Sequence, residues 1–248
     1  MSSMSLRPQI YCEASALGQP SLDEQADALC VQYKGQSAEE ILTGAVRESF
    51  AGRIALVSSF GAESVVLLHL ISQIDPYTPI IFLDTEKHFA QTLSYRKKLA
   101  ARFGLKSVID IRPEVIEKEA EDPDGTLWRR DADGCCSLRK VRPLKNALSA
   151  YDAWITGRKQ FHGGERIQLP IFDAAEPHIK VNPLVTWTPD DVATYIKLHD
   201  LPPHPLVAQG YPSIGCWPCT HPVTAGEDAR AGRWRGAAKT ECGIHGRD

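Results

Sequence analysis

Apolar residues recur along the chain with two different periods. Four short runs that are almost entirely apolar predict strands buried on both faces, over residues 54–58, 79–84, 107–111 and 153–156. Longer segments with helical spacing predict helices over residues 21–33, 38–50, 65–74, 91–103 and 141–150, and from Thr188 onward. Ser37 begins a capping box, and Thr188 is a cap residue followed by proline.

The alternation of strands and helices predicts the fold class. Nearly all-apolar strands that alternate with helices are typical of an α/β protein with a mainly parallel sheet flanked by helices. Residues 1–50 are expected to form N-terminal helices, and residues 51–200 the α/β core. Prolines and glycines break any long period beyond Leu201, so residues 201–248 are expected to be loop and short helix. Without an internal repeat or a low-complexity linker, a single domain over residues 1–248 is expected.

Composition and charge limit the partners and the cellular location expected for the protein. The 248 residues carry a net charge of -3, which gives no reason to expect nucleic acid or an acidic membrane as a partner. No window approaches the roughly 20 consecutive apolar residues of a membrane span, and the first residues lack the layout of a secretory signal. A cytoplasmic protein is therefore expected, in which clustered cysteines indicate metal binding or catalysis rather than disulfides.

Five of the seven cysteines form a pattern. Cys135 and Cys136 are adjacent, Cys216 and Cys219 form a Cys-x-x-Cys pair, and Cys242 stands alone. A Cys-x-x-Cys pair is common in zinc sites, in iron–sulfur sites and in thioredoxin-type redox motifs. Adjacent cysteines point apart on a regular helix or strand, so two adjacent ligands require local distortion. A cluster with several iron corners accepts this more easily than one tetrahedral ion, and both metals stay open at this point.

Three motifs resemble the assimilatory adenosine 5′-phosphosulfate reductases. They are Cys135-Cys136-Ser-Leu-Arg-Lys140, Cys216-Trp-Pro-Cys219 and Glu241-Cys242-Gly-Ile-His245. The resemblance, from about residue 58 to 245, implies a Rossmann-like adenine-nucleotide-binding fold with a C-terminal cluster-binding region and a mobile tail. It also implies a [4Fe–4S] cluster, whose ligands would be Cys135, Cys136, Cys216 and Cys219. The sister class, which reduces the 3′-phosphorylated nucleotide, lacks these cluster cysteines, so their presence favours the non-phosphorylated substrate.

The resemblance makes Cys242 the catalytic nucleophile, whereas an isolated cysteine is more often an incidental thiol. A thiolate is a soft nucleophile suited to attack on sulfur, and its attack on adenylyl sulfate would expel AMP and leave an S-sulfocysteine. An external dithiol carrier, thioredoxin by resemblance, would then release sulfite. Lys239, His245 and Arg247 are basic or potentially basic neighbours that would favour the thiolate.

The substrate is expected at the carboxyl ends of the first two strands. Small residues between strand and helix offer backbone N–H groups to a phosphate or sulfate, although many such turns only connect the two elements and bind no ligand. This loop contributes Ser58, Ser59, Gly61, Glu63 and Ser64. It resembles the Ser-Gly-Gly-x-Asp-Ser loop of ATP pyrophosphatases, but Glu63 replaces the aspartate and one glycine is absent, so ATP cleavage is not expected.

The second strand ends in Leu83-Asp84-Thr85, which matches the family's Leu-Asp-Thr motif of the adenosine pocket. An Asx cap for the following segment is the alternative interpretation of Asp84.

Basic residues in matched motifs are expected to hold the anionic substrate, because guanidinium forks suit phosphate and sulfate oxygens. The candidates are Lys140, Arg158, Arg166, Arg230 and Arg233, and His245 of the tail motif is added to them. Gln160 stands where the family usually has an arginine, so that position has no assigned role.

Three other functions remain open from sequence. The first is reduction of 3′-phosphoadenosine 5′-phosphosulfate, because one additional basic contact would admit the extra phosphate. The second is a cluster-containing tRNA sulfur-insertion enzyme of the ATP-pyrophosphatase type. The third is a zinc-stabilised binding module without catalysis. Sequence does not decide whether the chain forms a homo-oligomer.

Overall fold

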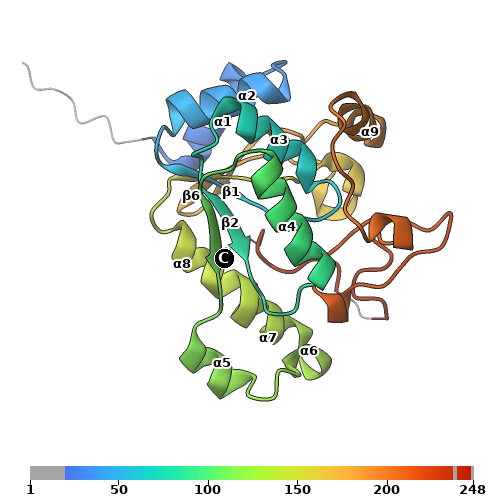
Figure 1. The fold of residues 1–248 in the computed structure, drawn as a ribbon. Helices are drawn as coiled ribbons and strands as arrows, with labels where there is room; N and C mark the ends of the chain where they lie inside the picture. Colours follow the sequence, from blue (N-terminus) through green and yellow to red (C-terminus); the bar gives the residue numbers. More distant parts are fainter. Residues whose placement is uncertain (1–19, 237–238, 247–248) are drawn as a thin grey trace, which may run out of the picture.

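A six-stranded sheet forms the centre of the protein (Figure 1). The computed structural model describes residues 20–236 and 239–246. The strands are β1 (Ile54–Val57), β2 (Ile80–Leu83), β3 (Val108–Ile111), β4 (Ala153–Ile155), β5 (Phe172–Ala175) and β6 (His178–Val181). They are ordered β3-β2-β1-β4-β6-β5, and every neighbouring pair is parallel except β5 with β6. The predicted α/β class with a mainly parallel sheet is confirmed.

Helices flank the sheet on both faces. They are α1 (Leu22–Gln32), α2 (Ala38–Gly44), α3 (Ser64–Ile74), α4 (Ala90–Arg102), α5 (Val115–Glu121), α6 (Leu127–Arg130), α7 (Ala132–Cys136), α8 (Arg142–Leu148) and α9 (Pro189–Leu198). π-Helical turns follow α2 at Ala45–Ser49 and α7 at Ser137–Val141. The predicted capping signals are present, since Ser37 and Thr188 each complete a capping box.

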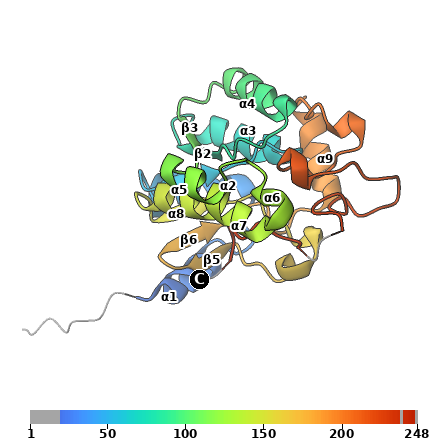
Figure 2. The same cartoon turned by 90° about the horizontal axis from the view of Figure 1, so that it is seen from below.

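Alternate residues of the strands serve two separate cores. Ile54 and Leu56 pack with helices α1 to α4 and α9, whereas Ala55 packs with α8 on the opposite face. This follows from the two-residue period of a strand. Figure 2 shows α3 and α4 on one side and α8 on the other. Ile244 of the C-terminal segment packs against the second core, so the chain end forms part of the fold.

The structure contains elements that the apolar pattern did not predict. The hairpin β5–β6 carries buried polar residues, including Asp173 and Lys180, which hide a strand period in the sequence. Helices α5 and α6 are short and mainly polar. The helix expected from residue 141 follows α7 and a π-helical turn, so helical structure already begins at Ala132.

Beyond Leu201 the chain is irregular, as predicted, with 3-10 turns at Val207–Gln209 and Trp217–Cys219. Among the described residues, no helix is long and apolar enough to cross a membrane.

The topology fixes where a ligand site forms. The chain runs outward from β1 through β2 to β3 and then returns to place β4 on the other side of β1. The connections that leave β1 and β4 therefore diverge, and α/β sheets bind ligands in the crevice at such a point.

Candidate active site

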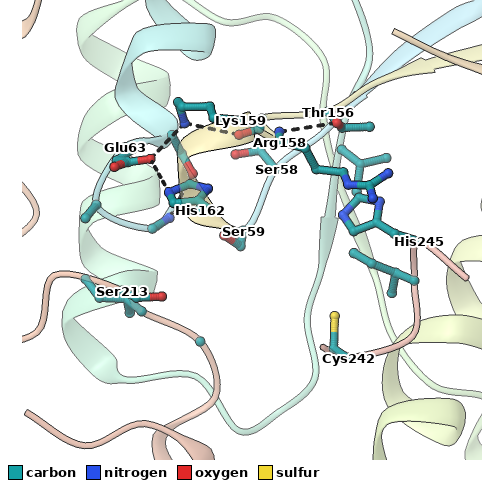
Figure 3. A pocket seen from close by; sticks show the side chains of 18 of the residues that line it. Ser58, Ser59, Glu63, Thr156, Arg158, Lys159, His162, Ser213, Cys242 and His245 are labelled. Atoms are coloured by element: carbon teal, nitrogen blue, oxygen red, sulfur yellow. Dashed lines mark hydrogen bonds and ion pairs between the residues drawn. The ribbon is translucent and has the colours of Figure 1, made fainter. Parts of the chain in front are cut away.

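A pocket opens at the carboxyl ends of β1 and β4 (Figure 3). Most of the residues predicted as substrate contacts line it: Ser58, Ser59, Gly61, Glu63, Ser64, Leu83, Lys140, Arg158, Arg166, Arg230, Arg233 and His245. Cys242 lines it as well, and Figure 3 shows its sulfur directed into the pocket, on the side opposite Ser58. The fold thus brings together residues separated by almost 200 positions in sequence.

The loop between β1 and α3 is held by its own side chains. The N–H of Phe60 donates to Ser58 Oγ at 3.2 Å, and the N–H of Gly61 donates to Ser64 Oγ at 3.0 Å. Phe60 has a φ of 51°, a strained value for a residue with a side chain. Its ring is buried edge-on against Phe82, with the centroids 5.6 Å apart. This buried contact fixes the turn that presents the loop to the pocket.

Two side chains that sequence analysis did not select as site residues, Lys159 and His162, pair with the carboxylate of Glu63. Lys159 Nζ donates to Glu63 Oε2 at 2.7 Å, and His162 Nε2 lies 3.3 Å from the same oxygen. Burial opposes ionisation of Glu63, but the hydrogen bond from His162 and the charge of Lys159 outweigh it and lower its pKa to about 2. The pair joins the loop after β1 to the loop after β4 (Figure 3).

Several cations face the pocket from different elements. Arg158 follows β4 and is buried, with its Nη1 atom 3.8 Å from Asp173 Oδ2. Arg233 Nε is buried without a hydrogen-bond partner among the described residues. Gly215 lets this arginine approach, because a Cβ there would lie 2.3 Å from Arg233 Nη2. Such a set of positive groups is suited to an anionic ligand.

Arg166 and Arg230 hold the C-terminal segment. Glu241 Oε1 accepts from Arg166 Nη2 at 2.7 Å and from Arg230 Nη2 at 3.2 Å. Arg230 Nη2 also donates to the carbonyl of Thr240 at 2.9 Å. Arg166 and Arg230, both predicted to contact the substrate, therefore bind residues just before Cys242.

His245 anchors the other side of Cys242. Its ring stacks on Trp154 with the planes 3° apart and the centroids 5.3 Å apart, and Lys180 Nζ donates to its carbonyl at 3.0 Å. Burial, reinforced by nearby Arg158, keeps the pKa of His245 well below its ordinary value.

The expectation that His245 supplies positive charge to the thiol is therefore wrong, because the ring is neutral at pH 7. Lys239 binds Asp133 and lies 5.8 Å from the centre of the Trp234 ring, and Arg247 lies outside the described residues.

The two cysteine pairs line a second, smaller cavity beside the first. Cys135 and Cys136 come from α7, and Cys216 and Cys219 from the 3-10 turn at Trp217–Cys219 and the residue before it. Both adjacent cysteines lie within α7, and a π-helical turn begins directly after Cys136.

Burial raises the pKa of Cys135 to about 11 and that of Cys136 to about 12. These thiols would be protonated at neutral pH unless a metal centre held them as thiolates. Over residues 20–236 and 239–246, no three histidine, cysteine, aspartate or glutamate side chains converge closely enough to hold a single metal ion. The four cysteines line one small cavity, and this all-thiol set suits a cluster with separated corners.

Lys140 connects the two cavities, because it lines both. It is partly buried, and burial works against its charge. The surrounding sulfurs of Cys216, Cys242 and Cys136 nevertheless raise its pKa above the ordinary value. A single cation thus lies among the cysteine cavity, the pocket and the isolated thiol.

Asp84 and Thr85 lie outside the wall of the pocket. Asp84 Oδ1 accepts from the N–H of Glu86 at 3.1 Å, which is the Asx-turn alternative, and Arg112 Nε donates to its other oxygen at 2.9 Å. Thr85 is buried with its Oγ1 atom 3.2 Å from Cys216 Sγ, so it contacts the cysteine cavity. Gln160 donates to the carbonyl of Leu169 at 3.0 Å, and this contact occupies the side chain that replaces the usual arginine.

Residues 53–222 match the model of the phosphoadenosine phosphosulfate reductase domain. The chain belongs to this family. An adenosine 5′-phosphosulfate reductase of Mesorhizobium japonicum is 53% identical over 206 residues, which cover 83% of this chain and 81% of the relative. A second relative of that name, from a Chelativorans species, is 48% identical over 227 residues, 90% of this chain and 93% of its own length.

Solved structures agree with the family assignment. The crystal structure of a phosphoadenylyl-sulfate reductase from Candida auris, a phosphate complex, has a TM-score of 0.69 at 30% identity and covers 82% of this chain and 99% of its own. An FMN adenylyltransferase of Candida glabrata has a TM-score of 0.56 at 15% identity, covers 83% of this chain and 68% of its own, and shows the fold alone. Family membership makes the chain an oxidoreductase acting on a sulfur group.

Sequence reasoning missed the residues that position the predicted ones. Lys159 and His162 hold Glu63, Trp154 carries His245, and Glu241 fixes the arginines. Lys159 and Glu241 belong to motifs identified in the sequence, and each lies next to a predicted site residue, Arg158 or Cys242. The contact from Trp154 to the tail had no local signal.

Proposed function

We propose that the protein reduces adenosine 5′-phosphosulfate to sulfite and AMP in sulfate assimilation. One observation carries the proposal: Cys242 faces a pocket rich in cations, beside a cavity lined by four cysteines. The names of the most similar relatives point to the same substrate. Together they support the non-phosphorylated nucleotide over the 3′-phosphorylated one.

The chemistry proceeds in two steps at Cys242. Its thiolate attacks the sulfonate sulfur, so an S–S bond forms, the bond from sulfur to the phosphate oxygen breaks, and the electron pair leaves with AMP. Arg158 and Arg233 neutralise the phosphate charge that grows on the leaving group. Cys242 then carries the sulfonate as an S-sulfocysteine.

The second step requires an external dithiol. One of its thiolates attacks Cys242 Sγ, and sulfite leaves with the electron pair of the S–S bond. The second thiol of the carrier then displaces Cys242 from the mixed disulfide, which leaves the carrier oxidised and the enzyme thiol restored. A thioredoxin-like protein in the cytoplasm fits this requirement, since reduced dithiol carriers operate there.

Cys135, Cys136, Cys216 and Cys219 are the proposed ligands of a [4Fe–4S] cluster. The all-thiol donor set supports it, and the adjacent pair ends a helix that continues as a π-helical turn. When bound, such a cluster supplies fixed charge close to Lys140. Lys140 in turn extends positive charge from that cavity towards the sulfonate position.

Metal and sulfide content distinguishes a zinc-stabilised binding module from a protein that holds a [4Fe–4S] cluster. An anaerobic preparation is expected to contain iron and acid-labile sulfide in equal amounts and to absorb visible light. One equivalent of zinc without visible absorbance would contradict the cluster.

Replacing the nucleophile tests the reaction. The variant C242S is expected to abolish sulfite formation from adenosine 5′-phosphosulfate while it keeps the visible absorbance. C30S is the matched control, because Cys30 hydrogen-bonds with the backbone of Phe172 and lies outside both cavities. Sulfite formation by C242S would contradict the mechanism.

The same assay distinguishes the two nucleotides. Wild-type protein is expected to release sulfite from adenosine 5′-phosphosulfate and to show no comparable rate with the 3′-phosphorylated form. Equal rates with both would contradict the substrate assignment and leave the role of Cys242 intact.

A further inference from the structure

Glu241 places a negative charge inside a pocket built for anions. Its carboxylate directly precedes Cys242 in sequence and lines the same pocket. Arg166 donates to one oxygen of this carboxylate through Nε at 3.0 Å and Nη2 at 2.7 Å, and Arg230 adds a contact at 3.2 Å. Charge-assisted contacts of this kind are stronger and more directional than neutral hydrogen bonds.

The donors of Arg166 are directed at the protein. Besides the two contacts to Glu241, its Nη1 atom lies 3.2 Å from His162 Nδ1. His162 in turn faces Glu63 from its other nitrogen at 3.3 Å. A chain of polar contacts therefore runs from the loop after β1 through Arg166 to the residue beside the nucleophile.

Cys242 lies between two anchors of different chemistry. On one side Glu241 is held by ionic contacts, and on the other His245 stacks on Trp154 while Lys180 binds its carbonyl. With both neighbours fixed, the thiol has little freedom except to face the pocket. Positioning of this kind raises the rate of a bimolecular step strongly.

The ionic anchor is the one suited to opening. The Glu241 side chain is 31% exposed and that of Arg230 is 20% exposed, so water reaches this contact. Partly exposed ion pairs contribute little net free energy and are broken readily. The Nδ1 atom of the stacked His245 ring, by contrast, is buried.

We propose that Glu241 is a positioning residue: held by Arg166 and Arg230, it docks the tail so that Cys242 faces the pocket. Its effect on sulfonate transfer rests on the proposed function, whereas the docking itself does not. Sulfite release by a small external thiol does not require the docked contact.

Alkylation of Cys242 tests docking without any substrate. In the anaerobic holoprotein, E241Q is expected to raise the rate of reaction of Cys242 with iodoacetamide about twofold, since the tail spends more time undocked. The rate is followed by mass spectrometry of the peptide that contains Cys242. E227Q is the matched control, because Glu227 pairs with exposed Arg235 outside the pocket, and its rate is expected to equal that of the wild type.

A second variant separates docking from charge. R166Q removes a positive group and E241Q a negative one, so a purely electrostatic influence on the thiol changes the two alkylation rates in opposite directions. Docking raises both rates, and the double variant E241Q/R166Q is expected to react no faster than the faster single variant. Opposite changes, or an unchanged rate in E241Q, would overturn the proposal.

Single-turnover kinetics test the division between the two steps. E241Q is expected to slow transfer of the sulfonate to Cys242 about twofold, whereas dithiothreitol releases sulfite from the sulfonated variant at least as fast as from the wild type. Equal slowing of both steps would indicate general damage to the fold and contradict the proposal. Failure of sulfonate transfer in the wild type would instead contradict the proposed function and leave the alkylation result standing.

Discussion

A buried arginine, Arg139, connects the cysteine cavity to the rest of the molecule. Arg139 follows the adjacent cysteines in the π-helical turn, and its side chain is 3% exposed. It donates to Asp122 Oδ2 at 2.7 Å and to the carbonyl of Thr85 at 2.9 Å. Since Thr85 contacts Cys216, this arginine ties one cysteine pair to the other.

Removing this arginine leaves a charge buried without compensation. R139Q is expected to lower the free energy of unfolding by about 3–5 kcal/mol, measured by urea denaturation of the anaerobic protein. R53Q breaks an ion pair to Asp152 whose side chains are 59% and 51% exposed, and it is expected to leave the free energy of unfolding nearly unchanged. Similar losses in the two variants would show that burial of the Arg139 pair has no energetic importance.

The elements differ in how well the sequence predicts them. The strands β1, β2 and β4 are nearly all apolar, and the predicted ranges agree with the observed ones to within two residues. Hairpin β5–β6 was missed because its polar residues are buried by contacts far away in sequence. Lys180, for example, binds the carbonyl of His245, a contact that no local pattern encodes.

Helix α7, which carries the adjacent cysteines, was not predicted from the sequence. It contains Gly134, a poor helix former. There the Asp131 side chain caps the helix by accepting from the N–H of Gly134 at 2.8 Å, and a Cβ at residue 134 would lie 2.3 Å from Asp131 Oδ2. The glycine is thus required by a close cap, which its residue type alone does not reveal.

His204 links the irregular segment after α9 to helix α4. Its Nε2 atom lies 3.1 Å from Thr92 Oγ1, and its Nδ1 atom accepts from the N–H of Leu206 at 3.1 Å. Since Nδ1 accepts, Nε2 carries the proton of a neutral ring. Burial lowers the pKa of His204 to about 4.

This lowered pKa predicts a pH dependence of stability. Between about pH 6.5 and pH 4 the unfolded chain binds a proton at His204 that the folded chain does not, so stability falls as the pH falls. H204Q is expected to lose less stability in urea over this window, by up to about 1.4 kcal/mol per pH unit. Parallel pH profiles for wild type and H204Q would contradict the assignment.

At the scale of the whole molecule, the site joins parts of the chain that are distant in sequence. The loops after β1 and β4 line the pocket, and the C-terminal segment supplies the nucleophile Cys242. The resemblance predicted most of the residues that line it, because recognised motifs carry the side chains that face the ligand. The side chains behind them, such as Trp154, are fixed by packing, which requires the folded chain.

Removing the tail tests this division of roles. A chain that ends at Thr240 is expected to keep the visible absorbance and to bind adenosine 5′-phosphosulfate, yet to form no sulfite. Its free energy of unfolding is expected to fall by about 1–3 kcal/mol, because Ile244 no longer covers the second core. Loss of the cluster on truncation would show instead that the tail supports the cysteine cavity, and I244A would then separate packing from chemistry.

The stacking of His245 on Trp154 has a consequence for the lifetime of the enzyme. A docked tail turns the Cys242 sulfur towards the pocket and leaves it only partly exposed, so dissolved oxidants reach it less readily than when the tail lifts. Oxidation of a thiol beyond the sulfenic acid is irreversible in most proteins. Between turnovers, the same contacts that aim the nucleophile therefore also slow its oxidation.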